Sequence, residues 1–142
     1  MYTKIKTPQE IVDMRESGRQ LATVLAYLRS EVRPGVTTKD LADLAAAKLK
    51  TLGGKPAFLG YQGFPDVICI SINDEVVHGI PRKDRVIDDG DIVSLDFGVS
   101  VNGMITDAAI SVVAGTTENH KVTELLKTTE LSLHKGIEQL KG

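Results

Sequence analysis

An Asn-Gly pair at the centre of a strand-like stretch constrains the fold of this chain more than any other feature. Residues 92–113 read IVSLDFGVSVNGMITDAAISVV, and Asn102-Gly103 divides them into two equal arms. A two-residue type I′ turn needs a positive φ at both central positions, which Asn-Gly tolerates well, so the stretch predicts a tight β-hairpin. Without a bulge, this turn fixes the register and places Gly98 opposite Asp107.

The predicted register brings two carboxylates together. Residues two apart along a strand point to the same face, so Asp96 shares a face with Gly98. Directly opposed residues also share a face, so Asp107, opposite Gly98, becomes a diagonal neighbour of Asp96 at about 5–8 Å. Two such carboxylates repel each other unless a cation or a shared proton lies between them, and Gly98 leaves room for one. Oxygen ligands favour divalent cations such as Mn, Mg, Fe, Co or Zn. The alternative is that both side chains are solvated on an open face, and one bulge would separate them.

Composition limits the class of protein. The 142 residues suit a single domain spanning 1–142, with 42% hydrophobic and 25% charged residues as in soluble globular proteins. The net charge is -2 and the basic residues are scattered, so we expect no direct nucleic-acid binding. No apolar run is long enough for a membrane span and no signal peptide is evident, so we expect no membrane partner. The single cysteine, Cys69, excludes an internal disulfide and favours a cytoplasmic location.

Two helices are expected before the hairpin. Residues 7–10, TPQE, combine a capping box with a proline at the first helical position, and residues 33–35, RPG, end the apolar periodicity that follows. Thr37 or Thr38 begins a second helix, which Gly53-Gly54 ends.

A strand and a further helix complete the prediction. Residues 67–72, VICISI, are almost entirely apolar and predict a strand buried on both faces. Apolar residues at helical spacing predict a last helix within residues 118–142, with His120 and His134 on its surface. The fold class is therefore α+β, an antiparallel sheet covered by helices on one side.

Two other segments carry candidate functional residues. Residues 56–65, PAFLGYQGFP, hold Phe58, Tyr61 and Phe64, which either tuck into the core or form the wall of an apolar pocket. His78 follows in a loop or strand end, 18 residues before Asp96. Its position allows either a structural role or one facing the two carboxylates.

Three segments together resemble type I methionine aminopeptidases: LGYQGFP at 59–65, VICISINDEVVHGIP at 67–81 and DDGDIVSLDFGVSVNGMITDAA at 88–109. Their order and spacing are typical of that family, and the helical flanks fit its N-terminal half. The resemblance implies the pita-bread fold, in which two pseudo-symmetric halves of antiparallel strands covered by helices enclose a two-metal site. We expect half of that fold here, with the helix in 118–142 opening the second half.

The resemblance also implies a function and roles for single residues. The family removes the N-terminal methionine from peptides and nascent proteins by attack of a metal-activated water. Asp96 would chelate one of two divalent ions, Asp107 would bridge both, and His78 would hydrogen-bond the scissile amide or the tetrahedral intermediate. The pocket for the methionine side chain would be lined by Phe58, Tyr61, Phe64 and Cys69.

One departure from the family pattern is clear. The family completes its metal site with one His and two Glu from the second half, the His in a GHGIG-like motif that has no match here. We therefore expect a truncated chain that alone binds no metal or one ion weakly and is inactive or nearly so. An exposed sheet edge would favour a homodimer or a complementing second half.

Three alternatives stay open at this point. The first is a proline-specific aminopeptidase of the creatinase type, which shares the two aspartates but uses a different pocket. The second is a catalytically incomplete binding protein built on the pita-bread scaffold. The third is a soluble α+β domain with no metal role.

Overall fold

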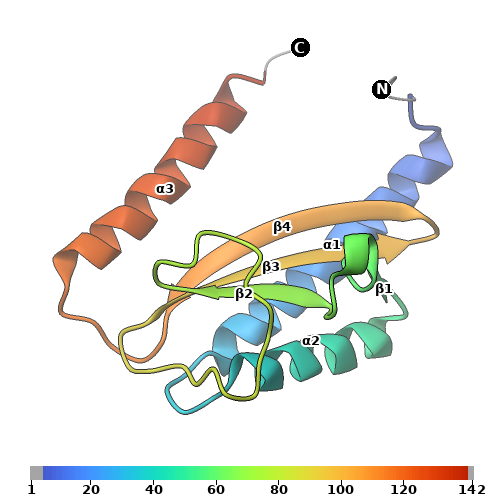
Figure 1. Cartoon of the computed structure of the whole chain (residues 1–142). Helices are drawn as coiled ribbons and strands as arrows, with labels where there is room; N and C mark the ends of the chain where they lie inside the picture. Colours follow the sequence, from blue (N-terminus) through green and yellow to red (C-terminus); the bar gives the residue numbers. More distant parts are fainter. Residues whose placement is uncertain (1–4, 141–142) are drawn as a thin grey trace.

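The computed structural model describes residues 5–140 (Figure 1). The elements in chain order are α1 (Pro8–Glu31), α2 (Thr38–Leu52), β1 (Lys55–Pro56), a single 3-10 turn η1 (Tyr61–Gly63), β2 (Ile68–Ile72), β3 (Ile92–Val101), β4 (Met104–Val113) and α3 (His120–Glu138). Over this part of the chain, the helices are all too short or too polar to cross a membrane.

The predicted helix ends are confirmed for α1 and α2. The Thr7 hydroxyl accepts a hydrogen bond from the Glu10 amide, and the Glu10 carboxylate accepts one from the Thr7 amide, which is the capping box. Thr37 caps α2, so of the two candidate residues the first is used. Gly53, at φ 82°, ends α2 in the left-handed conformation that favours glycine.

The sheet is antiparallel and is built around β3. β4 pairs with one edge of β3 over the whole length of both strands. The other edge of β3 pairs with β2 and with the two-residue strand β1. Gly98 lies opposite Asp107 and Val101 opposite Met104, with no bulge between 92 and 113, so the predicted hairpin register is confirmed. The turn itself has positive φ at both Asn102 and Gly103.

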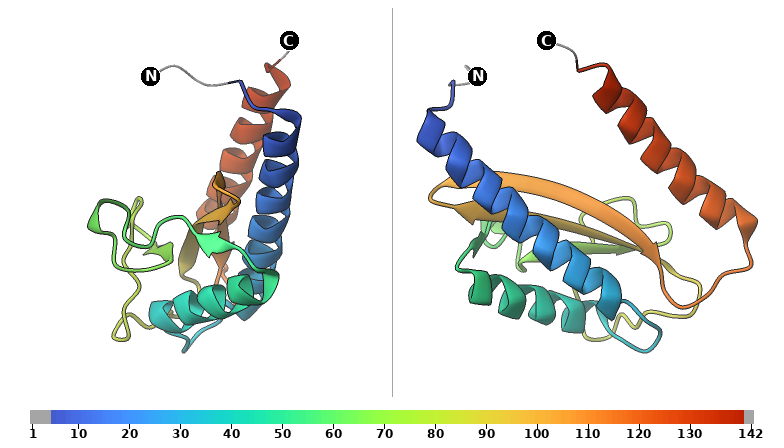
Figure 2. Two further views of the ribbon diagram at one scale, coloured as in Figure 1. Left: turned by 90° about the vertical axis from the view of Figure 1, so that its right-hand side faces the viewer. Right: turned by 180° about the vertical axis from the view of Figure 1, so that it is seen from behind.

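Helices α1 and α2 cover one face of this sheet, as predicted (Figure 2). That face presents the buried side chains of β3, which are Val93, Leu95, Phe97 and Val99. The helices add Val24, Leu28, Leu41, Ala45 and Leu49, all at most 1% exposed. One apolar core therefore lies between two helices and the sheet, and the other face of the sheet is left without helical cover.

Polar contacts fix α1 against the hairpin. Ser17 is buried, its hydroxyl donates to the Val99 carbonyl at 2.8 Å, and the Thr106 hydroxyl lies 2.8 Å from it. Near the turn, the Asn102 amide group donates to the Asp13 carboxylate at 3.1 Å. These contacts span both strands, so they hold the hairpin in one orientation relative to the core.

Helix α3 stands apart from the sheet (Figures 1 and 2). None of its side chains is buried, and both His120 and His134 are exposed, as expected for surface residues. Its exposed large apolar residues are Leu125, Leu131, Leu133 and Ile137, with Leu140 just beyond the helix. The expected helix within 118–142 is thus found at His120–Glu138, and residues 141–142 lie outside the described part of the chain.

Candidate metal centre

The open face of the sheet carries the two candidate carboxylates. Asp96 on β3 lies between Cys69 on β2 and Ala109 on β4, and Asp107 lies opposite Gly98, one position further along the same face. Strand alternation explains why the flanking residues of Asp96 enter the core while Asp96 does not. Asp96 is half-buried and Asp107 is exposed.

The two carboxylates interact unfavourably when both are charged. Burial raises the pKa of Asp96, and the charge of Asp107 and a hydrogen bond with the Asp107 carboxyl group raise it further. The charge of His78 acts in the opposite direction and lowers the pKa of Asp96. When both carboxylates are ionised, the pair can only accept hydrogen bonds, and a nearby positive charge stabilises it.

The space above Gly98 is not free for a metal ion, and this part of the prediction is wrong. A Cβ at Gly98 would lie 2.5 Å from Phe58 Cε1 and 3.1 Å from the Ala57 Cβ. The missing side chain makes room for the Phe58 ring instead. Phe58 and Phe64 then meet edge to face, with ring centroids 6.5 Å apart and planes at 89°.

The four residues expected to line the methionine pocket fall into two groups. Phe58 lies over Gly98, which is opposite Asp107, and Phe64 packs against Phe58. Cys69 is buried on β2 opposite Asp96. Burial raises the pKa of the Cys69 thiol to about 11, with the charges of Asp96 and Asp107 adding to the effect, so the thiol is neutral at pH 7. Tyr61 is 66% exposed in η1 and is not enclosed by the described residues.

His78 reaches the site from the loop that follows β2. It is exposed, adopts a positive φ of 61°, and is close enough to Asp96 for its charge to act on that carboxyl group. This electrostatic effect is compatible with a role for His78 beside the carboxylates, which stays a prediction. Sequence reasoning did not single out Ser71, whose hydroxyl accepts a hydrogen bond from the Gly79 amide at 3.0 Å.

The donor set decides how much metal chemistry these residues can support. Two carboxylates that face one point and repel each other fit a divalent cation, for which oxygen is the preferred ligand. Within residues 5–140, however, no group of three or more His, Cys, Asp or Glu side chains converges on one point. Asp96 and Asp107 fit the ions, and they supply only part of a coordination sphere.

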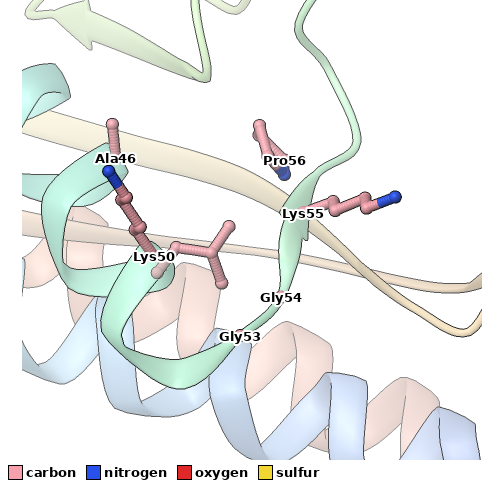
Figure 3. Close-up of a pocket in the computed structure, with 7 residues that line it drawn as sticks. Ala46, Lys50, Gly53, Gly54, Lys55 and Pro56 are labelled. Carbon is pink, nitrogen blue, oxygen red and sulfur yellow. The ribbon is translucent and has the colours of Figure 1, made fainter.

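Two cavities are found whose linings include neither Asp96 nor Asp107. One, of about 370 Å³, is at the C-terminal end of α2, and Figure 3 shows Lys50 and Lys55 at its rim with their ammonium groups on opposite sides. Its lining contains neither a carboxylate nor a histidine. The other, of about 300 Å³, adjoins His78 and is lined also by Ile70, Glu75, Ile80, Arg82 and Arg85.

Comparison with known proteins decides the family. The model of metallopeptidase family M24 matches residues 12–142. The chain belongs to metallopeptidase family M24. Membership of a metallopeptidase family implies divalent metal cofactors, which argues against the third alternative, a soluble α+β domain with no metal role.

The relatives are methionine aminopeptidases. Methionine aminopeptidase 1 of Bacillus subtilis is 43% identical over 136 residues, which are 96% of this chain and 54% of that protein. The methionine aminopeptidase of Aquifex aeolicus is 41% identical over 145 residues, covering 98% of this chain and 56% of that protein. The resemblance to this family is confirmed, and the chain spans about half the length of these curated relatives.

Solved structures confirm the fold. The crystal structure of methionine aminopeptidase from Thermotoga maritima matches 99% of this chain and 56% of its own, with a TM-score of 0.95 and 40% identity. The prolidase from Pyrococcus furiosus matches 84% of this chain with a TM-score of 0.73 and 24% identity, which shows a shared fold alone. The pita-bread prediction is therefore confirmed, and the relatives at 40% identity favour the methionine enzymes over the proline-specific ones.

Proposed function

We propose that Asp96 and Asp107 bind divalent metal ions in a methionine aminopeptidase site, and that the substrate is the N-terminal methionine of peptides and nascent proteins. The observation that carries the proposal is the hairpin register, which sets both carboxylates on the one face that the helices leave open. The raised pKa of Asp96 supports it, because burial and the charge of Asp107 both disfavour the ionised carboxylate, and a bound cation would offset both effects. The names of the relatives supply the reaction class.

The chain's own residues then have separable roles. When bound, the metal ions supply Lewis-acid polarisation of the peptide carbonyl and an activated water. Asp96 and Asp107 hold the ions through carboxylate oxygens. His78 hydrogen-bonds the scissile amide of the substrate, or delivers a proton to its nitrogen as the peptide bond breaks.

The apolar part of the site receives the methionine side chain. The Phe58–Phe64 pair presents ring edges and faces beside the carboxylates, and Cys69 contributes a neutral thiol to the floor. Thioethers make favourable contacts with aromatic rings, so this wall suits methionine better than a charged side chain. Tyr61 is proposed to close the outer rim of the same pocket.

Residues 5–140 alone are proposed to be inactive or nearly so. Two carboxylates leave most of the coordination sphere of an ion to water, so binding is weak and the ion is poorly oriented. Further ligands come from a complementing second half or a second copy of the chain, for which the exposed apolar residues of α3 offer a contact surface. Size-exclusion chromatography with light scattering tests self-association, and a clean monomer at high concentration contradicts a homodimer.

Complementation tests the function. The chain is mixed with the part of the Thermotoga maritima enzyme that lies outside the matched 56%, with Mn²⁺ and the peptide Met-Ala-Ser. We expect methionine release from the mixture, none or nearly none from either part, and loss of release with Asp107→Asn but not with Asp88→Asn. A complex that forms, binds Mn²⁺ and releases no methionine would favour a catalytically incomplete binding protein. The proposed location is the cytoplasm, where nascent chains are made.

A further inference from the structure

The backbone at His78 is held in a conformation that L-residues disfavour. Four non-glycine residues of the described chain have a positive φ: Gln62, Asn73, His78 and Asn102. Asparagine tolerates this region comparatively well, and Asn102 lies in a turn that requires it. His78, at φ 61°, lies directly before a glycine in the loop after β2, so its surroundings must hold it there.

The residue after His78 is fixed by two hydrogen bonds to β2. The Gly79 amide donates to the Ser71 hydroxyl at 3.0 Å, and the Gly79 carbonyl accepts from the Ile70 amide at 2.9 Å. Gly79 thus lies along the outer edge of β2 as one additional rung. A side chain is excluded at this place, because a Cβ on Gly79 would overlap the Ile70 carbonyl oxygen and lie 2.9 Å from the Ser71 Cα.

Ser71 is the polar member of an otherwise apolar buried strand. It is 4% exposed, and its neighbours in β2 are isoleucines and Cys69. A buried hydroxyl needs a hydrogen-bond partner, and Ser71 finds the Gly79 amide. Ser71 lies opposite Ser94 of β3. The Ser94 hydroxyl is hydrogen-bonded to the Ser111 hydroxyl of β4 and not to the loop, so Ser71 and Ser94 have different partners.

The beginning of the same loop is also anchored. The Glu75 carboxylate accepts from the Ile72 amide at 2.8 Å, and the Glu75 amide donates to the Ile72 carbonyl at 3.1 Å. With both ends of the loop attached to β2, the remaining freedom lies in residues 76–78. The position of His78 therefore depends on the bonds that Gly79 makes with Ser71 and with Ile70.

We propose that Ser71 and Gly79 are positioning residues that hold the His78 backbone in its left-handed conformation, so that the imidazole faces Asp96 and Asp107. The inference deepens the proposed function and rests on it for the role of His78. The Ser71 hydroxyl touches neither substrate nor metal in this assignment. It acts through Gly79 on the direction of the His78 side chain.

The test compares Ser71→Ala with Ser94→Ala in the ¹⁵N-labelled chain, with a chelator present. Ser94→Ala also removes a hydroxyl from this row of the sheet but leaves Gly79 untouched. We expect hydrogen exchange of the Gly79 amide to be about fivefold faster in Ser71→Ala, the factor for one hydrogen bond worth about 1 kcal/mol. The amide–α-proton coupling of His78, which reports φ, changes in Ser71→Ala and not in Ser94→Ala, and Ser71→Thr restores both values.

The proposal is overturned if exchange at Gly79 and the coupling of His78 are unchanged in Ser71→Ala, or if Ser94→Ala changes them equally. A second arm adds Mn²⁺ and measures paramagnetic broadening of the His78 ring, which we expect to be strong in the unchanged chain and at least twofold weaker in Ser71→Ala. If Mn²⁺ does not bind the unchanged chain, the part of the proposed function in which Asp96 and Asp107 hold an ion without a second half fails. The exchange and coupling values still decide whether Ser71 and Gly79 hold His78.

Discussion

Replacing Asp96 with asparagine should stabilise the metal-free chain at pH 7. Asparagine has nearly the same shape, and it removes both the cost of burying a charge and the repulsion from Asp107. The hydrogen bond between the two carboxyl groups brings their charges to about 4 Å, for which Coulomb's law gives about 1 kcal/mol in water and about 4 kcal/mol at an effective dielectric constant of about 20. Because Asp107 is exposed, we expect about 1 kcal/mol, or about 3 °C in Tm.

The same reasoning predicts how the stability difference between Asp96→Asn and the unchanged chain varies with pH. The pKa of Asp96 is raised in the folded state, so the folded chain binds more protons than the unfolded chain between the ordinary Asp value of about 3.9 and the raised value. The destabilisation by Asp96 is therefore present at pH 7, shrinks as pH falls through the raised pKa, and is absent below about pH 3.9. The stability difference between Asp96→Asn and the unchanged chain should shrink in the same window.

Urea denaturation with a chelator, at pH values from 7 to below 4, measures that difference. The pKa of Glu16 is lowered to about 2 by its hydrogen bonds to Arg19 and Gln20, so its own contribution is lost as the medium becomes acidic. Subtracting the two chains cancels this opposing effect, because both retain Glu16. Asp88→Asn removes an exposed carboxylate and serves as the control. A destabilised Asp96→Asn, or a gain that does not depend on pH, would refute the reasoning.

Three further substitutions test the packing around the site. Gly98→Ala should displace the Phe58 ring and destabilise the chain by about 1–3 kcal/mol, and adding Phe58→Ala should recover part of that loss. Ser17→Ala should cost about 1–3 kcal/mol, because the Val99 carbonyl loses a buried donor. Thr37→Ala should cost about 1 kcal/mol through loss of the α2 cap. Urea denaturation measures all three.

Each of these has a result that would count against it. Full additivity of Gly98→Ala and Phe58→Ala would mean that the ring does not occupy the space over the glycine. A neutral Ser17→Ala would mean that the contact between α1 and the hairpin contributes little to stability. For Thr37→Ala, unchanged stability would mean that the cap contributes little to α2.

Local chemistry made the hairpin predictable. Asn102-Gly103 allows one tight turn, and that turn alone fixes which residues lie opposite each other, so the pairing of Gly98 with Asp107 followed from the sequence. The helix caps at Thr7 and Thr37 are equally local. The covering of one face by α1 and α2 followed from the apolar periodicity of both helices.

Contacts between distant segments were not predictable from the sequence in the same way. The space over Gly98 is filled by Phe58, which is forty residues earlier in the chain, and no local pattern indicates which loop crosses the sheet there. The bond from Gly79 to Ser71 is likewise set by how the loop returns along β2. The sequence signal that could have found it is the glycine after His78, which marks a close approach of two backbones.

Calorimetric titration of Mn²⁺ tests the central claim, that Asp96 and Asp107 form a metal site. The unchanged chain, Asp107→Asn and Asp88→Asn are titrated side by side, with methionine release from Met-Ala-Ser followed in the same samples. We predict weak binding by the unchanged chain and by Asp88→Asn, loss of binding by Asp107→Asn, and no measurable turnover. Equal binding by all three chains would contradict the assignment of the metal site to Asp96 and Asp107. Tight binding with turnover would contradict the conclusion that the described residues supply only part of the metal coordination sphere.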